Sequence, residues 1–118
     1  MQNYKDLKVW EKAHQFTLAV YETTRSFPKE EIYGLTGQLR RAASSIPSNI
    51  AEGCGKNTQL ELAHYLNISL GSSNEAEYYL MLSKDLKYLN DTIFTVLFNS
   101  INEIKAMLIA LIAKVRTT

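Results

Sequence analysis

The sequence predicts an all-α protein folded as an antiparallel up-down-up-down four-helix bundle, and three observations lead to this expectation. Apolar residues recur at helical spacing along four segments of the chain. The 118 residues include only 5 Gly and 2 Pro, which argues against a β fold with many turns. The connections between the four segments are short, so consecutive helices are expected to run antiparallel. The length suits one domain, over residues 1–118.

The first predicted helix runs from about Lys5 to Arg25. Pro28 ends this segment, and Glu30 and Glu31 follow it at the positive N-terminal end of the next helix. The core seam of the first helix has the spacing of a helical bundle and is formed by Val9, Ala13, Phe16, Val20 and Phe27. A second row lies beside the seam and comprises Trp10, His14, Thr17 and Tyr21.

The second predicted helix begins after Tyr33-Gly34 and runs to about Gly53. Its apolar stripe consists of Leu35, Leu39, Ala42, Ile46 and Ile50, and a polar row runs beside it with Gln38, Arg41, Ser45, Asn49 and Glu52. Pro47 lies inside this helix, where it removes a backbone donor at a cost of about 3 kcal/mol. The carbonyl of Ala43 therefore needs another donor.

The third predicted helix opens at Thr58, with Glu61 three residues later forming a capping box, and it continues to about Leu89. Its middle is rich in small residues. Gly71 costs about 1 kcal/mol relative to Ala, so we expect a neighbouring helix to approach closely at this point. Tyrosines flank this patch at positions 65, 78 and 79.

The fourth predicted helix is capped by Asn90 and Asp91 and extends to about Arg116. One apolar seam contains Ile93, Leu97, Ile101, Ile104, Leu108, Leu111 and Val115, while Phe94, Phe98, Met107, Ile109 and Ile112 lie partly outside it. A helix in a monomeric bundle needs only one such stripe. The surplus predicts burial against another subunit.

The polar row of the second helix is the main candidate site. In an antiparallel pair, Arg41 is level with Gly71 and can reach Glu75, one turn away. One interpretation is a binding surface formed by Gln38, Arg41, Ser45, Asn49, Glu52 and Glu75. The other is a paired polar network that fixes helix register; we favour it because the row adjoins the core stripe.

No combination of residues indicates catalysis. His14 and His64 lack the further ligands of a metal site, Cys54 lies at a helix C-terminus that disfavours a thiolate, and no phosphate-binding loop is present. We therefore expect no enzyme activity, catalytic residue, metal or cofactor. Basic pairs at Arg40/Arg41 and Lys84/Lys87 are candidate phosphate contacts, although the net charge is only +1.

Cysteine content and hydropathy indicate a soluble cytoplasmic protein. The single Cys54 excludes an internal disulfide and suits a reducing compartment. The longest apolar stretch, residues 107–115, is shorter than the roughly 20 residues of a membrane span. We expect neither a signal peptide nor a membrane partner.

Several motifs carry a family resemblance. They are Phe27-Pro28-Lys29-Glu30-Glu31, Tyr33-Gly34-Leu35-Thr36, Gln38-Leu39-Arg40-Arg41-Ala42 and Ser45-Ile46-Pro47-Ser48-Asn49-Ile50-Ala51-Glu52-Gly53, with Leu7-Lys8-Val9-Trp10 and Gly71-Ser72 besides. With these motifs the chain resembles the 23S rRNA-intervening sequence proteins, small bacterial four-helix bundle proteins. The resemblance implies a homopentamer. A similar fold occurs in the accessory variability determinant of diversity-generating retroelements, which works with a reverse transcriptase and nucleic acid.

Two functional hypotheses follow. The first is a non-enzymatic homo-oligomeric protein, a pentamer if the resemblance holds, that serves as an assembly or scaffold for RNA or for a protein partner. The alternative is an accessory protein that binds RNA or DNA directly through basic patches of the oligomer.

Overall fold

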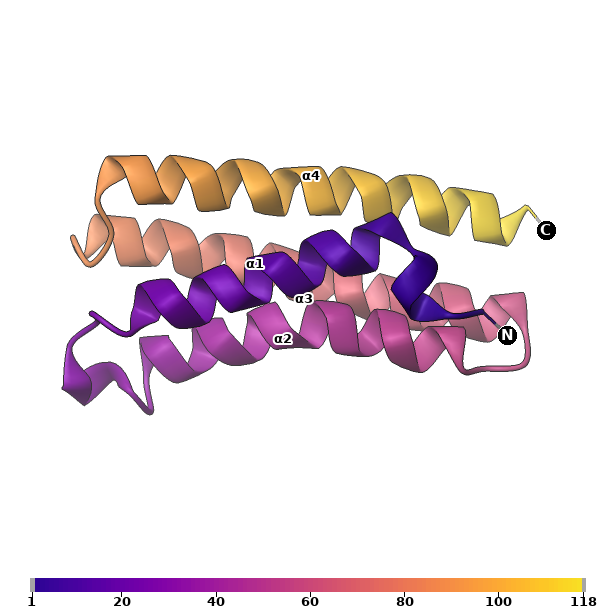
Figure 1. Cartoon of the computed structure of the whole chain (residues 1–118), viewed down its shortest axis with the longest axis horizontal. Coiled ribbons are helices and arrows are strands. Elements are labelled where there is room, and N and C mark those ends of the chain that lie inside the picture. Colours follow the sequence, from indigo (N-terminus) through magenta and orange to yellow (C-terminus); the bar gives the residue numbers. More distant parts are fainter. Residues whose placement is uncertain (1, 118) are drawn as a thin grey trace.

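Four α-helices run antiparallel along the 45 Å long axis of the molecule (Figure 1). The structure is a computed structural model and describes residues 2–117. The helices are α1 (Lys8–Thr24), α2 (Leu35–Cys54), α3 (Gln59–Asp85) and α4 (Asp91–Arg116). Each packs against the next in sequence, and α4 closes the bundle against α1. The predicted four-helix bundle is therefore confirmed.

The core is a single hydrophobic cluster to which all four helices contribute. The predicted seam of the first helix is buried throughout, at Val9, Ala13, Phe16, Val20 and Phe27, and so is the apolar stripe of α2. Burial of such side chains contributes about 1.5–3 kcal/mol each.

The beginning of the chain differs from the prediction of one continuous first helix. A 3-10 turn, η1 (Tyr4–Asp6), comes first, Leu7 is extended, and α1 begins at Lys8. The break lets the Tyr4 ring pack edge-on against Trp10, with ring centroids 5.0 Å apart. Aromatic pairs of this geometry add about 0.5–1.5 kcal/mol beyond their burial.

The connection from α1 to α2 contains a second 3-10 turn, η2 (Lys29–Glu31). Glu31 Oε1 accepts a hydrogen bond of 3.1 Å from the Leu35 N–H, so this acidic residue does lie at the N-terminus of α2. Its other oxygen accepts from the Tyr88 hydroxyl at 3.0 Å, which ties the connection to the α3–α4 turn.

Helix α3 begins as predicted, because the Thr58 hydroxyl accepts from the Glu61 N–H at 3.1 Å. Its end was predicted at Leu89 and lies earlier, at Asp85. Lys87 adopts a left-handed backbone with φ of 66°, and the Tyr88 N–H bonds back to the Ser83 carbonyl at 2.9 Å. This pattern is a Schellman motif, which usually has glycine at the left-handed position. Because this position is Lys87 and not glycine, the sequence contains no residue that would predict the end of α3 here.

Helix α4 is capped by Asn90, whose side chain accepts from the Ile93 N–H at 2.8 Å. Its buried seam is Leu97, Ile101, Ile104, Leu108, Ile112 and Val115. Two seam assignments were wrong: Ile93 is 38% exposed, and Ile112 rather than Leu111 is fully in the core. The apolar stripe drifts around a straight helix, and the prediction kept it on one line.

The expectation of close helix approach at Gly71 was also wrong. A Cβ built at Gly71 would meet nothing within 4 Å, and the residue is exposed. The small residues that do face the neighbouring helices are Ser69, Ser73 and Ala76, each fully buried. Ser69 and Ser73 are two residues from Gly71 and Ala76 is five, so they point about 140–200° away from it around α3.

Candidate functional site

The polar row of α2 brings Arg41 and Glu75 together. Arg41 Nη2 lies 3.9 Å from Glu75 Oε2 on α3, and the same nitrogen donates to the side-chain oxygen of Gln38. Glu75 in turn accepts a hydrogen bond of 3.4 Å from Tyr79. The predicted proximity of Arg41 and Glu75 is confirmed, and both side chains are partly open to solvent, at 60% and 40% exposure.

The remaining residues of the row bond within α2 or to the turn that directly follows it. Ser45 donates to the Arg41 carbonyl at 2.8 Å, Asn49 donates to the Ser45 carbonyl at 2.8 Å, and Glu52 pairs with Lys56 at 3.5 Å. The row is therefore a series of local contacts along an accessible face. The argument that buried charges must pair does not apply to it, because no charge in the row is buried. Its role as a binding surface stays a prediction.

The carbonyl that Pro47 leaves without a helical donor has a partner on another helix. Thr17 Oγ1 of α1 lies 3.0 Å from the Ala43 carbonyl oxygen and 2.9 Å from the Ala13 carbonyl oxygen. Thr17 is buried, so its one hydroxyl hydrogen is shared between these acceptors. From the sequence we expected only that the Ala43 carbonyl needs another donor. The donor is Thr17, which the sequence had placed in the second row beside the core seam of the first helix.

A second carbonyl of α2, that of Ile46, has a similar contact from α3. The Ser69 hydroxyl of α3, fully buried, donates to the Ile46 carbonyl at 2.9 Å. The buried hydroxyls of Thr17 and Ser69 thus link the proline-containing part of α2 to α1 on one side and to α3 on the other. A threonine or serine in an apolar row, level with a proline in the next helix, is the sequence signal that could have identified them.

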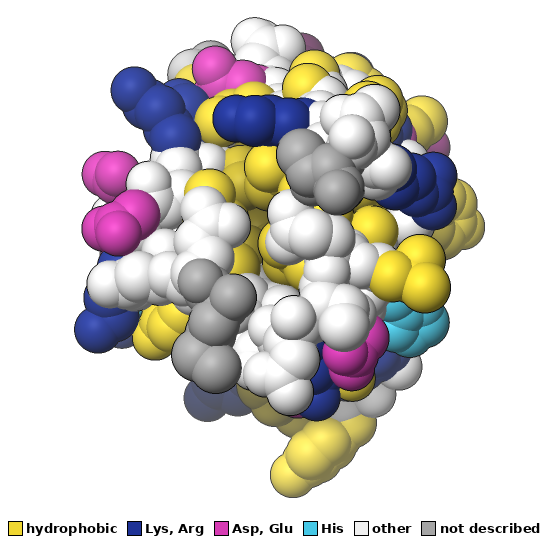
Figure 2. All heavy atoms as spheres, turned by 90° about the vertical axis from the view of Figure 1, so that its right-hand side faces the viewer, with side chains coloured by type: hydrophobic (Ala, Val, Ile, Leu, Met, Phe, Trp, Pro, Cys, Tyr) yellow, Lys and Arg dark blue, Asp and Glu magenta, His cyan; other side chains and the backbone are white. Residues whose placement is uncertain are grey.

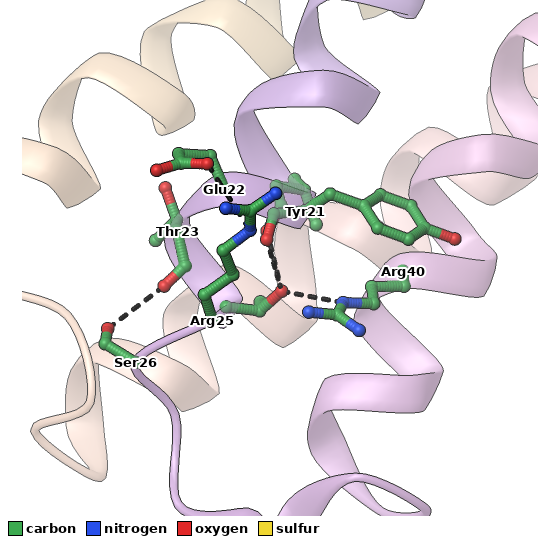
Figure 3. Close-up of polar contacts among 8 residues, drawn as sticks. Tyr21, Glu22, Thr23, Arg25, Ser26 and Arg40 are labelled. Atoms are coloured by element: carbon green, nitrogen blue, oxygen red, sulfur yellow. Dashed lines mark hydrogen bonds and ion pairs between the residues drawn. The ribbon is translucent and has the colours of Figure 1, made fainter.

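The adjacent arginines Arg40 and Arg41 point toward different helices. Arg41 extends toward α3, whereas Arg40 Nε donates to Thr24 Oγ1 of α1 at 2.8 Å. The Arg40 guanidinium also lies over the Tyr21 ring, 4.8 Å from its centroid (Figure 3). The two arginines therefore do not form one joint phosphate contact as predicted, because their charges lie on different sides of α2.

The second predicted basic pair lies at the end of α3. The Lys84 ammonium is 4.6 Å from the centroid of Phe94, and Lys87 occupies the left-handed turn position. Both lysines are exposed. Asp85 and Asp91 are close in sequence, so both signs of charge occur together here.

The opposite end of the bundle also mixes charges. Figure 2 looks onto this end and shows Lys and Arg side chains interspersed with carboxylates around a patch of hydrophobic side chains. A hollow of about 310 Å³ lies beside Cys54 and Lys56. Burial raises the pKa of the Cys54 thiol, so the thiolate is disfavoured.

The histidines are engaged with aromatic rings. His14 stacks on Trp10 with centroids 5.1 Å apart, and His64 meets Tyr65 edge-on at 5.3 Å. Across residues 2–117, no group of three or more His, Cys, Asp or Glu side chains is placed to hold a metal ion.

Helix α4 carries exposed apolar side chains on both sides of its buried seam. Val96 is 64% exposed and Ile109 56% exposed. By length and composition alone α4 could cross a membrane, with a mean hydropathy of 1.6 over an 18-residue window, a property that core helices of soluble proteins share. The sequence-based expectation of no membrane span considered only the shorter apolar stretch at residues 107–115. Only 28% of that window is buried within the chain.

Comparison with known proteins identifies a family and similar solved structures. Residues 5–110 match the family model of the 23S rRNA-intervening sequence protein. A solved structure from Bacteroides thetaiotaomicron, described as a protein with unknown function from the S23 ribosomal protein family, is similar with a TM-score of 0.82 and 25% identity. The similarity covers 89% of this chain and 95% of that one. No curated protein shows significant sequence similarity to the chain.

Proposed function

Because this chain belongs to the 23S rRNA-intervening sequence protein family, we propose that it is a non-catalytic, homo-oligomeric assembly protein that acts as a scaffold for RNA or for a protein partner. The proposal rests on the exposed apolar side chains of α4. Val96, Ile109 and Ile93 are substantially exposed in the single chain. Val96 and Ile109 lie about 140° apart around the helix, so they flank its buried seam on opposite sides. Exposed apolar side chains of this kind mark interaction sites in soluble proteins.

The proposed assembly is a closed ring in which each subunit uses two different patches. One patch is the exposed apolar flank of α4 around Ile109. Candidate complementary patches are the exposed side chains of α1 at Leu18 and of α3 at Tyr78 and Met81. Two unlike patches form a heterologous contact, and such contacts form a ring where the rotation between subunits closes. The number of subunits, five, comes from the family resemblance.

Assembly through α4 accounts for its hydropathy better than insertion into a membrane. Glu103 pairs with Lys12 of α1 at 2.9 Å, and Lys105 pairs with Glu77 of α3 at 2.9 Å. These charges lie midway along the helix, where a bilayer would penalise them by several kcal/mol. A cytoplasmic location belongs to the same proposal and is supported by the lone, buried Cys54.

A charge placed on the apolar face tests the proposal. We expect Ile109→Lys to shift the protein toward monomer in size-exclusion chromatography with light scattering, with the helical circular-dichroism signal retained. The matched control is Leu60→Lys, which alters an exposed apolar residue, 81% exposed, at the start of α3. Equal oligomeric mass for both variants would exclude the α4 face as the interface.

A second candidate function is direct binding of RNA or DNA through basic patches repeated around the oligomer. It is supported by Arg40 and Lys84, which form no ion pair with any carboxylate in residues 2–117. The near-neutral chain and the pairing of Arg41 with Glu75 oppose it. Phosphate contacts act by counterion release, so this function requires affinity that falls steeply with salt.

Fluorescence anisotropy with duplex RNA and DNA tests the second function. We expect weak binding at physiological salt, and loss of that binding in the Arg40→Gln, Lys84→Gln double variant. Sub-micromolar binding that salt leaves unchanged would contradict a phosphate-based contact.

A further inference from the structure

The seam between the end of α1 and the start of α2 encloses a recess of about 270 Å³. The α1–α2 recess, as we call it, has Phe27 and Pro28 among its apolar lining residues, and Arg25, Lys29 and Arg40 contribute positive charge to its wall. Its existence does not depend on the proposed assembly. Apolar lining with a few polar groups is the usual composition of a small-molecule site.

Arg40 is held in a fixed position at this recess. Its Nε is bound to the Thr24 hydroxyl at 2.8 Å, and its plane lies over the Tyr21 ring (Figure 3). Among residues 2–117 it forms no ion pair, unlike Arg41, which pairs with Glu75. The terminal nitrogens of a guanidinium form a planar fork that matches the oxygens of a phosphate or carboxylate. Arg40 therefore presents a preorganised donor pair.

Thr36 supplies a second, independent observation. It lines the recess from the first turn of α2, is only 2% exposed, and its hydroxyl has no hydrogen-bond partner in the part of the chain described. Leaving a buried hydroxyl unpaired is unfavourable, so a partner is expected. The oxygen is covered by protein atoms, and we expect a ligand's entry to turn this side chain toward it.

Two carboxylates near the recess, Glu22 and Glu31, are already occupied, whereas Glu30 is exposed and does not line the recess. Glu22 pairs with Arg25 at 3.5 Å, and Figure 3 shows Arg25 turned toward it. Both carboxylate oxygens of Glu31 accept hydrogen bonds, one from the Leu35 N–H at the start of α2 and the other from the Tyr88 hydroxyl. Lys29 and Arg40 are left to attract an anion, and two cations favour a doubly charged group over a single carboxylate.

We propose that the α1–α2 recess binds a small organic phosphate, a phosphate monoester whose apolar ester group packs against Phe27 and Pro28. The phosphate oxygens accept hydrogen bonds from the Arg40 fork and from the Thr36 hydroxyl. Such a group occurs both in free metabolites and at the 5′ end of an RNA strand, and the two sources share this chemistry.

Titration calorimetry and amide chemical-shift mapping of the full chain test the proposal, with phenyl phosphate as the probe. We expect saturable binding, with affinity at least about threefold higher than for inorganic phosphate because of the apolar lining. Arg40→Gln should weaken binding about tenfold or more, since hydrogen bonds to charged groups are the strong ones. Arg41→Gln is the matched control on the adjacent residue and should bind as the wild type does.

Thr36→Val separates binding from folding. It removes a buried hydroxyl that has no partner, so the unfolding temperature should stay the same or rise, while the affinity for phenyl phosphate falls about threefold or more. Unchanged affinity in this variant or in Arg40→Gln would overturn the assignment, as would the absence of saturable binding to the wild type. Competition by a 5′-phosphorylated oligoribonucleotide, but not by its 5′-hydroxyl form, identifies RNA ends as the source. Failure of both to compete, with phenyl phosphate bound, identifies a free metabolite.

Discussion

The hydroxyl of Thr17 on α1 lies 3.0 Å from the carbonyl oxygen of Ala43 on α2, the carbonyl that Pro47 deprives of its helical donor. A proline inside a helix costs about 3 kcal/mol, partly because this acceptor is left unpaired. The contact converts that defect into a link between two helices.

The link predicts an energetic coupling between Thr17 and Pro47. Thr17→Val should lower the free energy of unfolding by about 1–2 kcal/mol, because the Ala43 carbonyl loses its donor in a buried site. In the Pro47→Ala background, residue 47 regains an N–H for Ala43, so the same substitution should cost less. Urea denaturation of the four proteins of this double-mutant cycle measures the difference. An equal cost in both backgrounds would show that Thr17 does not serve the proline.

The left-handed position at the end of α3 predicts a stabilising substitution. Lys87→Gly should raise the free energy of unfolding by about 1 kcal/mol, since glycine adopts a φ of 66° without the steric cost that a Cβ incurs. Lys87→Ala removes the same charge but keeps the Cβ, and should have little effect. Thermal denaturation followed by circular dichroism compares the two. If alanine stabilises as much as glycine, the charge rather than the backbone is responsible.

The Tyr88–Glu31 contact predicts a loss of stability at alkaline pH. The hydrogen bond to Glu31, then burial and the charges of Glu31 and Glu30, raise the pKa of Tyr88 above its ordinary value of 10.0. A folded-state pKa above the unfolded value gives a stabilisation that is complete below about pH 10 and is lost as the pH rises through the folded pKa. Tyr88→Phe has no hydroxyl to titrate, so its urea midpoint should fall less than that of the wild type between about pH 9 and pH 11. Parallel pH profiles would argue against it.

The Arg41–Glu75 pair is expected to contribute little to stability. Both side chains are more than a third exposed and lie 3.9 Å apart, so solvent screens their attraction. A double-mutant cycle of Arg41→Gln and Glu75→Gln should give a coupling below about 1 kcal/mol that decreases with added salt. A larger coupling, insensitive to salt, would restore the interpretation of the row as a structural network.

Much of the fold could be predicted from the sequence because periodicity reports local structure. The seam around Phe16 and the caps at Thr58 and Asn90 depend on residues close together in the chain, and all three are as expected. The end of α3 could not be found this way, because its left-handed residue is Lys87 and not glycine.

The candidate site was harder to predict because it depends on contacts between helices. The antiparallel arrangement was enough to bring Arg41 near Glu75. It did not reveal that Arg40 turns the other way, toward Thr24, or that Thr36 is buried without a partner. These facts follow from the rotation of each helix about its axis, which a single sequence constrains only through its apolar stripe.

The central claim is self-association, and the mass of the native protein in solution tests it most directly. Size-exclusion chromatography coupled to light scattering at micromolar concentration should give five times the 13.4 kDa mass of the chain. The apolar face of α4 would then be covered by a neighbouring subunit. A mass of 13.4 kDa would contradict the account, and a dimer would keep the association but reject the ring.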